Sequence, residues 1–242
     1  MTRETPAPPV ETELLQASVY EQIRDDIISG RLGHNARLKV AELAVAYGTS
    51  TNPVREALQQ LRGEGFVIIE PNRGARVRPT DEDFVRDIIE IEALIEPELT
   101  RWFVGIATEA DIAELEAIQR EIEALNFADM KRHGDLDTRF HQVIYDRHYN
   151  RHAAELWWRH REVLRAISRR FPTSLSRRAT VIREHRELID ALRAQDADRA
   201  ARIVAEHVRG SGRHIIEHMR LAATSADRAT QRPARGPQRE TT

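Results

Sequence analysis

Apolar residues recur at helical spacing through most of the chain. Between residues 81 and 220 their pattern predicts about six helices, at roughly 81–105, 108–125, 128–149, 151–170, 175–194 and 197–220. Pro97 lies inside the first of these segments, where we expect a bend. Because no strand-like alternation interrupts this region, it predicts an all-α bundle of six helices.

The first 80 residues follow a different pattern. Three shorter apolar stripes, near residues 20–27, 40–47 and 54–61, predict three helices, and Gly48 lies where the second should end. Further on, a β-rich run, a turn and a short stretch of alternating apolar and basic residues predict a small hairpin. Helices followed by a hairpin in this order predict a winged helix-turn-helix, so the whole chain is expected to be mainly α.

Glycine and proline mark a domain boundary. They cluster at 29–37, 48–53 and 63–79 and become rare from Asp81 onward, which places the boundary between Pro79 and Thr80. The predicted parts of the chain are a disordered N-terminus at 1–13, a winged helix-turn-helix domain at 14–79, an all-α domain at 80–220 and a disordered tail at 221–242.

Composition narrows the function classes without selecting one. The 242 residues include no cysteine, which excludes disulfides, thiolate metal sites and cysteine nucleophiles and fits a cytoplasmic protein. No apolar run approaches the ~20 residues that span a bilayer, so no membrane partner is expected. The net charge is −2, and residues 1–80 contain ten basic and ten acidic side chains, so nucleic-acid binding would have to come from a local patch.

The stretch GTSTNPVREALQQL, residues 48–61, carries its polar residues at the start of the third predicted helix. Pro53 is compatible with a first helical turn, and Ser50 or Asn52 could cap the free amides there. In a helix-turn-helix the N-terminal residues of the second helix of the pair meet base edges and phosphates. The predicted DNA-contacting residues are Lys39, Thr49, Ser50, Thr51, Asn52, Arg55, Arg73 and Gly74.

Ordinary capping and turn residues on a solvated helix would give the same cluster. The basic residues around it, including the wing arginines Arg73, Arg76 and Arg78, favour DNA contact instead. Because residues 1–80 have no net charge, we expect tight binding to double-stranded operator DNA to need two copies, hence a homodimer.

The run AELAVAYGTSTNPVREALQQLRGEGFV, followed by NRGARV, resembles the DNA-binding domain of the GntR family of bacterial transcription regulators. The PVREAL core with the following LxxEG carries the resemblance. Two positions depart from it: Thr51 stands where the family usually has Arg, and Ala41 stands where some members have Arg. Both are operator-contact positions in the family, so the usual family operator is not assumed.

Four residues of the helical region could form a metal site. Asp137 and His141 are four residues apart, so they project from one helix face. His185 and His207 lie eleven residues before and after Asp196, where a turn is expected, so an antiparallel helix pair would set them level, each about 16 Å from the turn. Three imidazoles and one carboxylate suit a divalent metal ion such as Zn²⁺, Ni²⁺, Mn²⁺ or Fe²⁺.

Chance alignment is the alternative, because the chain has ten histidines. His133 lies four residues before Asp137, and two rival pairs at the same spacing are His148 with His152 and His214 with His218. A surface histidine pair is usually only solvated.

The pattern DxxFH, a later EH and a second His twenty-two residues further resembles the FCD effector domain of the FadR subfamily. It is present as Asp137 to His141, Glu184-His185 and His207. Six helices point to the shorter, vanillate-regulator-like branch. The resemblance implies a metal held by Asp137, His141, His185 and His207, with a small-molecule carboxylate effector completing its coordination.

One position departs from this pattern in the expected effector pocket. The first FCD helix commonly contains RxxLE, with its Arg facing the pocket, whereas here EALIE places Glu92 at that position. Either the pocket prefers a neutral or cationic group, or Glu92 is held in a structural salt bridge.

A metal-dependent hydrolase or oxygenase on the same bundle is the alternative function. No HExxH, adjacent His-Asp pair or ExxH occurs, so the usual zincin, phosphohydrolase and di-iron patterns are absent. A DNA-binding protein with a non-functional bundle is a third possibility. The sequence favours a regulator that is not an enzyme and whose operator affinity is controlled by an effector.

Overall fold

The structure, a computed structural model, describes residues 18–71, 73–168 and 174–230. The chain divides between Arg78 and Pro79 into two compact units, each with its own core. The disorder predicted for residues 1–13 lies outside the described residues.

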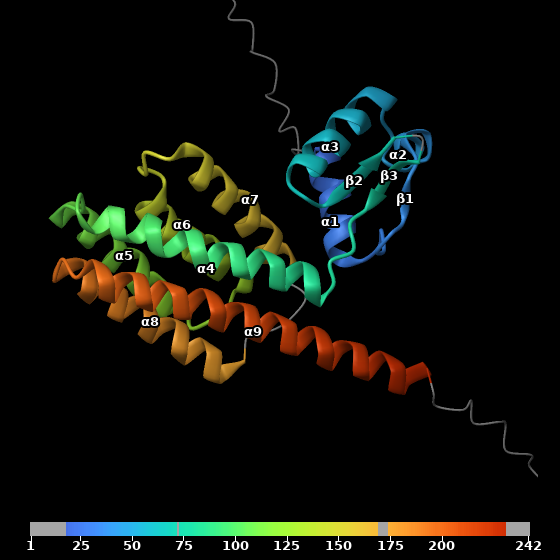
Figure 1. The fold of residues 1–242 in the computed structure, drawn as a ribbon. Helices are drawn as coiled ribbons and strands as arrows, with labels where there is room; N and C mark the ends of the chain where they lie inside the picture. Colours follow the sequence, from blue (N-terminus) through green and yellow to red (C-terminus); the bar gives the residue numbers. More distant parts are fainter. Residues whose placement is uncertain (1–17, 72, 169–173, 231–242) are drawn as a thin grey trace, which may run out of the picture. The chain divides into compact units, whose positions relative to one another are not determined.

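The first unit contains helices α1 (Val19–Ser29), α2 (Val40–Ala46) and α3 (Thr51–Gly63) and strands β1 (Arg37–Leu38), β2 (Val67–Glu70) and β3 (Gly74–Val77). The strands form an antiparallel sheet in the order β1-β3-β2 (Figure 1). The predicted winged helix-turn-helix is confirmed. Strand β1 was not predicted, because two residues are too short to show an alternation.

Local sequence explains where these helices begin and how they pack. Ser18 and Glu21 form a reciprocal capping box at the start of α1. The α3 residues Val54, Ala57, Leu58 and Leu61 all face the core. Ser50 occupies the N-cap position of α3, but its side chain makes no capping hydrogen bond, contrary to one expectation. The hydroxyl group is therefore not committed to the helix end.

The second unit is all-α, as predicted. Its helices are α4 (Glu82–Val104), α5 (Glu109–Leu125), α6 (Met130–Tyr145), α7 (Arg151–Ser168), α8 (Leu175–Arg193) and α9 (Ala197–Thr230). Helix α4 lies along α9 and also packs against α6 and α7, while α8 packs against α9 and α5 (Figure 1). Helix α4 continues through Pro97 as one helix. None of the helices in the described ranges combines the length and apolar character needed to cross a membrane.

The prediction of a disordered tail at 221–242 was wrong for residues 221–230. Helix α9 does not end near residue 220 but continues to Thr230. Residues 221–230 contain four alanines and neither glycine nor proline, so their helix propensity is high enough to extend the preceding helix. The prediction treated the tail as one segment, and its later part contains prolines from Pro233 onward, which disfavour a helix. Residues 231–242 lie outside the described part of the chain.

Candidate DNA-binding surface and metal centre

The start of α3 presents polar side chains to solvent. Ser50, Thr51, Asn52 and Arg55 are exposed, while Thr49 is half-buried. The opposite face of the helix is packed into the core, so the packing holds the backbone that carries these side chains in place. Their hydroxyl, amide and guanidinium groups are the donors and acceptors that read base edges and phosphates.

A surface depression connects α3 with β1 and the wing. Its lining includes four basic residues, Arg37, Lys39, Arg55 and Arg73, and none of the described residues that line it is acidic. Gly74 also lines it and adopts a φ of +79°, a conformation that glycine accepts without strain. The depression thus brings together four of the predicted DNA-contacting residues, Lys39, Arg55, Arg73 and Gly74.

Arg37 is a basic residue of this surface that sequence reasoning missed. It lies on β1 opposite Arg76 of β3, a pairing that periodicity could not reveal. The available signal was its spacing, since Arg37 and Lys39 alternate just before the second helix.

The arginines of the wing divide into two kinds. Arg73 is 79% exposed and has only a loose contact with Glu70, at 3.7 Å. By contrast, Arg76 donates to Glu70 and Asn35, and Arg78 donates to the backbone oxygen of Gly65. Arg73 therefore remains the wing residue best placed for DNA, because exposed ion pairs contribute little and exchange readily.

Three histidines meet inside the second unit. His141 on α6, His185 on α8 and His207 on α9 each offer a ring nitrogen, and these nitrogens lie within 4.8 Å of one another. The three side chains are 1%, 1% and 6% exposed. The predicted antiparallel alignment of His185 and His207 agrees with this geometry.

Hydrogen bonds fix how two of these rings are turned. The Nδ1–H of His207 donates to Oε2 of Glu184 at 2.8 Å, because a carboxylate can only accept. His185 Nδ1 lies 2.9 Å from Oε1 of Gln119, whose own amide group donates to Glu123, so His185 is the donor here too. In both rings Nε2 is left with its lone pair free to bind an ion.

Several polar atoms at this site have no hydrogen-bond partner. They are Nε2 of His185 and both ring nitrogens of His141, all fully buried and without a partner among the described residues. A buried unsatisfied polar group costs roughly 1–3 kcal/mol. A bound metal ion would supply a partner for Nε2 of His185 and for one of the two His141 nitrogens, so the residues present fit such an ion.

The ionisation of these rings also suits metal binding. Burial, reinforced by the nearby Arg161 charge, holds the pKa of His141 well below its ordinary value. Burial likewise lowers the pKa of His185 to about 3. Both imidazoles are therefore neutral at physiological pH, the form in which histidine binds metals.

Asp137 lies at the edge of the histidine cluster. Its Oδ1 is 3.5 Å from Nε2 of His185, while its other oxygen accepts from Arg161 on α7. Burial alone would raise the pKa of Asp137, but Arg161 and the surrounding histidines hold it well below the ordinary value. The carboxylate is thus ionised, with one oxygen directed to the cluster.

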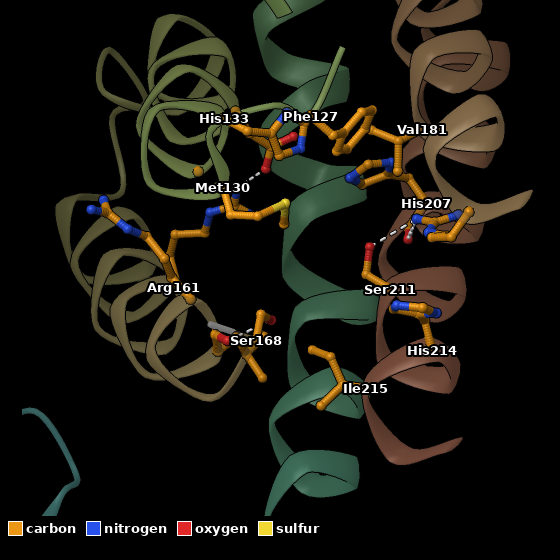
Figure 2. A pocket seen from close by; sticks show the side chains of 15 residues that line it. Phe127, Met130, His133, Arg161, Ser168, Val181, His207, Ser211, His214 and Ile215 are labelled. Atoms are coloured by element: carbon orange, nitrogen blue, oxygen red, sulfur yellow. Dashed lines mark hydrogen bonds and ion pairs between the residues drawn. The ribbon is translucent and has the colours of Figure 1, made fainter. Parts of the chain in front are cut away.

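A cavity of about 150 Å³ opens beside the cluster (Figure 2). His207 lines it, so the cavity shares one residue with the cluster, and Asp137 at the edge of the cluster lines it too. The remaining wall comes from Phe127, just before α6, and from α6, α7, α8 and α9, and it mixes apolar with polar side chains. The shape suits a small ligand that reaches the histidines with one end.

Glu92 is not among the described residues that line this cavity. It is 2% exposed on α4, and its Oε1 lies 2.5 Å from Nδ1 of His160. Burial raises the pKa of Glu92 to about 7, and burial together with the Glu92 charge raises that of Glu96 to about 8. A protonated Glu92 can donate to the neutral His160 ring, so Glu92 has a structural partner, through a hydrogen bond between neutral groups and not through the salt bridge considered above.

Comparisons with known proteins cover both units. The model of bacterial regulatory proteins of the gntR family matches residues 15–77, and the FCD domain model matches residues 87–210. The galactonate operon transcriptional repressor of Escherichia coli K12 is 26% identical over 197 residues, covering 73% of this chain and 86% of that protein. The transcriptional repressor RspR of the same strain is 27% identical over 216 residues, covering 86% and 91%.

Solved structures show the same fold. Escherichia coli McbR/YncC superimposes with a TM-score of 0.62, covering 87% of this chain and 96% of that one. At 21% identity this likeness concerns the fold alone.

Proposed function

The chain belongs to the gntR family of bacterial regulatory proteins, with an FCD domain after its DNA-binding domain, and we propose that a metal-bound carboxylate controls its affinity for operator DNA. Like the relatives reported above, it is a transcription regulator and not an enzyme. The six helices of the second unit favour the shorter branch of the FadR subfamily.

The proposed metal ligands are Asp137, His141, His185 and His207. The observation that carries this assignment is the meeting of three buried histidines from three helices, two of which, His141 and His185, have ring nitrogens without partners among the described residues. A divalent ion at this point would supply Lewis-acid binding of an anionic oxygen. The chain itself orients His185 and His207 through Gln119 and Glu184, and burial keeps His141 and His185 neutral.

The proposed effector occupies the adjacent cavity. A volume of about 150 Å³ is the size that accepts benzene in an engineered cavity, so the ligand is small. One end would reach the ion beside Asp137 and His207, which favours a carboxylate. The name of one relative refers to a galactonate operon, and galactonate is a carboxylate.

On the DNA side, α3 is the proposed recognition helix, with Thr49, Ser50, Thr51, Asn52 and Arg55 at its start. Lys39, Arg73 and Gly74 would contact the backbone from the depression beside it, together with Arg37. We propose that a homodimer in the cytoplasm reads two half-sites of a palindromic operator through the major groove.

A continuous route joins the two functions within the chain. His207 lies on α9, and α9 packs along α4. Helix α4 begins at Glu82, a few residues after the boundary between the units. A change at the metal site that shifts α9 would thus reach the connection to the DNA-binding unit through one packed helix pair.

The test combines metal analysis with DNA binding by the full chain. An operator sequence obtained by in vitro selection is titrated by fluorescence anisotropy, with and without Zn²⁺ and small carboxylates. The parent should bind about one ion per chain and change its operator affinity when a carboxylate is added. His207→Ala should lose the ion and the response, whereas the exposed control His152→Ala should keep both. Equal metal content in the parent and both variants would remove this site from consideration.

A further inference from the structure

One histidine in the cavity wall is not a proposed metal ligand and is not fully hydrogen-bonded within the described part of the protein. His133 on α6 lines the cavity and is 9% exposed, yet its Nδ1 has no hydrogen-bond partner among the described residues. It lies four residues before Asp137, or about 6 Å along the helix axis. His133 is therefore beside the proposed metal site but outside the histidine cluster, and it brings a ring with an unsatisfied, buried nitrogen to the wall of the cavity.

Phe127 holds this ring in place. The two ring centroids are 4.0 Å apart, and Figure 2 shows both side chains at one side of the cavity. Phe127 reaches this position from a left-handed backbone conformation, with φ of +58°, which a bulky residue rarely adopts. Strain of this kind persists only where the surroundings enforce it, and it is common at ligand sites.

Burial lowers the pKa of His133, so its ring is neutral at physiological pH. A neutral imidazole has one donor and one acceptor nitrogen. It can therefore donate to a hydroxyl or carbonyl oxygen, or accept from a hydroxyl group, but it carries no charge to offset a second carboxylate.

The charges of the described cavity wall point the same way. Three arginines line it, and each already faces a carboxylate: Arg161 faces Asp137, Arg165 faces Asp135 and Arg177 faces Glu184. The proposed metal ion would be the main uncompensated positive charge available to a ligand. One anionic group is thus accommodated, and a second would be buried without a partner, which is costly.

We propose that His133 is a specificity-determining residue of the cavity, which hydrogen-bonds an uncharged hydroxyl or carbonyl oxygen of a small monocarboxylate whose carboxylate lies at the histidine cluster. This rests on the function proposed above and adds to it the chemical class of the ligand. The required molecule carries one negative charge at one end and a neutral oxygen some carbon atoms away.

Matched acids test the proposal. Isothermal titration of the full chain loaded with Zn²⁺ compares propionate with 3-hydroxypropionate, butyrate with 4-hydroxybutyrate, and pentanoate with 5-hydroxypentanoate. Each pair differs by one hydroxyl group, and the series covers three chain lengths because the reach to His133 selects among them. Succinate, compared with butyrate, adds a second charge at nearly the same size.

We expect the hydroxy acid to bind about three- to tenfold more tightly at one chain length or more, the effect of one added hydrogen bond. In His133→Phe this ratio should fall to about one, and His133→Asn, which can still hydrogen-bond, should recover part of it. The exposed control His152→Phe should keep the parent ratio. Succinate should bind more weakly than butyrate.

Two results would overturn the inference and leave the proposed function standing. One is binding of the plain acids with a ratio near one at every chain length, and the other is a ratio that survives in His133→Phe. Tighter binding of succinate than of butyrate would likewise contradict the single-charge argument. If the metal-loaded chain bound none of these acids, both the proposed effector site and the role of His133 would be wrong.

Discussion

Glu184 accepts a hydrogen bond from the Nδ1–H of His207 at 2.8 Å, which links α8 to α9 at the proposed metal site. The same carboxylate pairs with Arg177 at 3.1 Å, and Arg177 in turn donates to the backbone oxygen of His207. The His207 ring is thus held by a carboxylate that is itself held in place. Partners of this kind raise the basicity of a metal-binding imidazole and fix its orientation.

Glu184→Gln should therefore weaken metal binding without removing a ligand. Loss of such a partner commonly costs about 10–100-fold in metal affinity. Competition with a chromogenic chelator measures the effect. Glu206→Gln is the matched control, because Glu206 is adjacent to His207 in sequence but exposed and paired with Arg209. Equal losses in both variants would show that Glu184 has no special role.

Gly212 allows α9 to approach α4 closely. A Cβ atom at this position would lie 2.6 Å from Cγ1 and 2.8 Å from Cγ2 of Ile89, a buried side chain with little room to move. Gly212→Ala should reduce the free energy of unfolding by about 1–3 kcal/mol, partly offset by the better helix propensity of alanine. Gly63→Ala has open space around its Cβ and should stabilise by up to about 1 kcal/mol. Urea denaturation distinguishes them, and a stabilised Gly212→Ala would contradict the packing argument.

Arg55→Ala should weaken operator binding by about 1–3 kcal/mol, because its side chain is exposed near the start of α3, the proposed recognition helix. Arg37→Ala should weaken binding to all sequences alike and reduce the salt dependence by about one unit of slope, as expected for a phosphate contact. Arg62→Ala, exposed in the last turn of α3, is the control. Anisotropy titrations at several salt concentrations give both quantities, and an unchanged affinity for Arg55→Ala would exclude it from the interface.

The buried carboxyl groups of α4 predict a pH-dependent stability difference. The pKa of Glu92 is raised to about 7 and that of Glu96 to about 8, both mainly by burial. The folded chain therefore holds protons that the unfolded chain releases at lower pH, so these groups reduce stability as the pH rises from about 5 to about 8.

Glu92→Gln should remove part of this loss, because an amide cannot ionise and can still donate to His160. Compared with the parent at equal metal content, the variant should gain stability steadily between pH 5 and pH 8 in urea denaturation. Glu98→Gln changes an exposed residue of the same helix and should show no such trend. A constant difference for Glu92→Gln across this range would contradict the raised pKa.

Much of the fold was accessible from the sequence because helices carry their own periodic signal. Counting residues on either side of the turn at Asp196 was enough to set His185 level with His207. Strand β1 has only two residues, which is too short to show an alternating pattern. The end of α9 depended on the helix propensity of a few residues within a tail of mixed composition.

The contacts around the site were harder to predict from the sequence, because they join residues that are far apart in the chain. Arg161 faces Asp137 from another helix, and Gln119 meets His185 from 66 positions away. Glu92 contacts His160 at a separation of 68 residues, a pairing that the spacing of residues along α4 could not reveal. Helical spacing places residues on a face but does not show which face of a neighbouring helix they meet.

The pairing of Asp137 with Arg161 also sets the electrical balance of the histidine site. His141 and His185 are uncharged, and the carboxylate is already offset by a guanidinium group, so little negative charge is left to balance an ion. A divalent ion would bring two positive charges into a buried space, and an anionic effector would neutralise one of them. Ion and effector should then each raise the affinity of the other, so that an added carboxylate shifts a metal titration to lower metal concentrations. Such a regulator would act as a coincidence detector, because it would respond to its effector only when enough metal ion is also present.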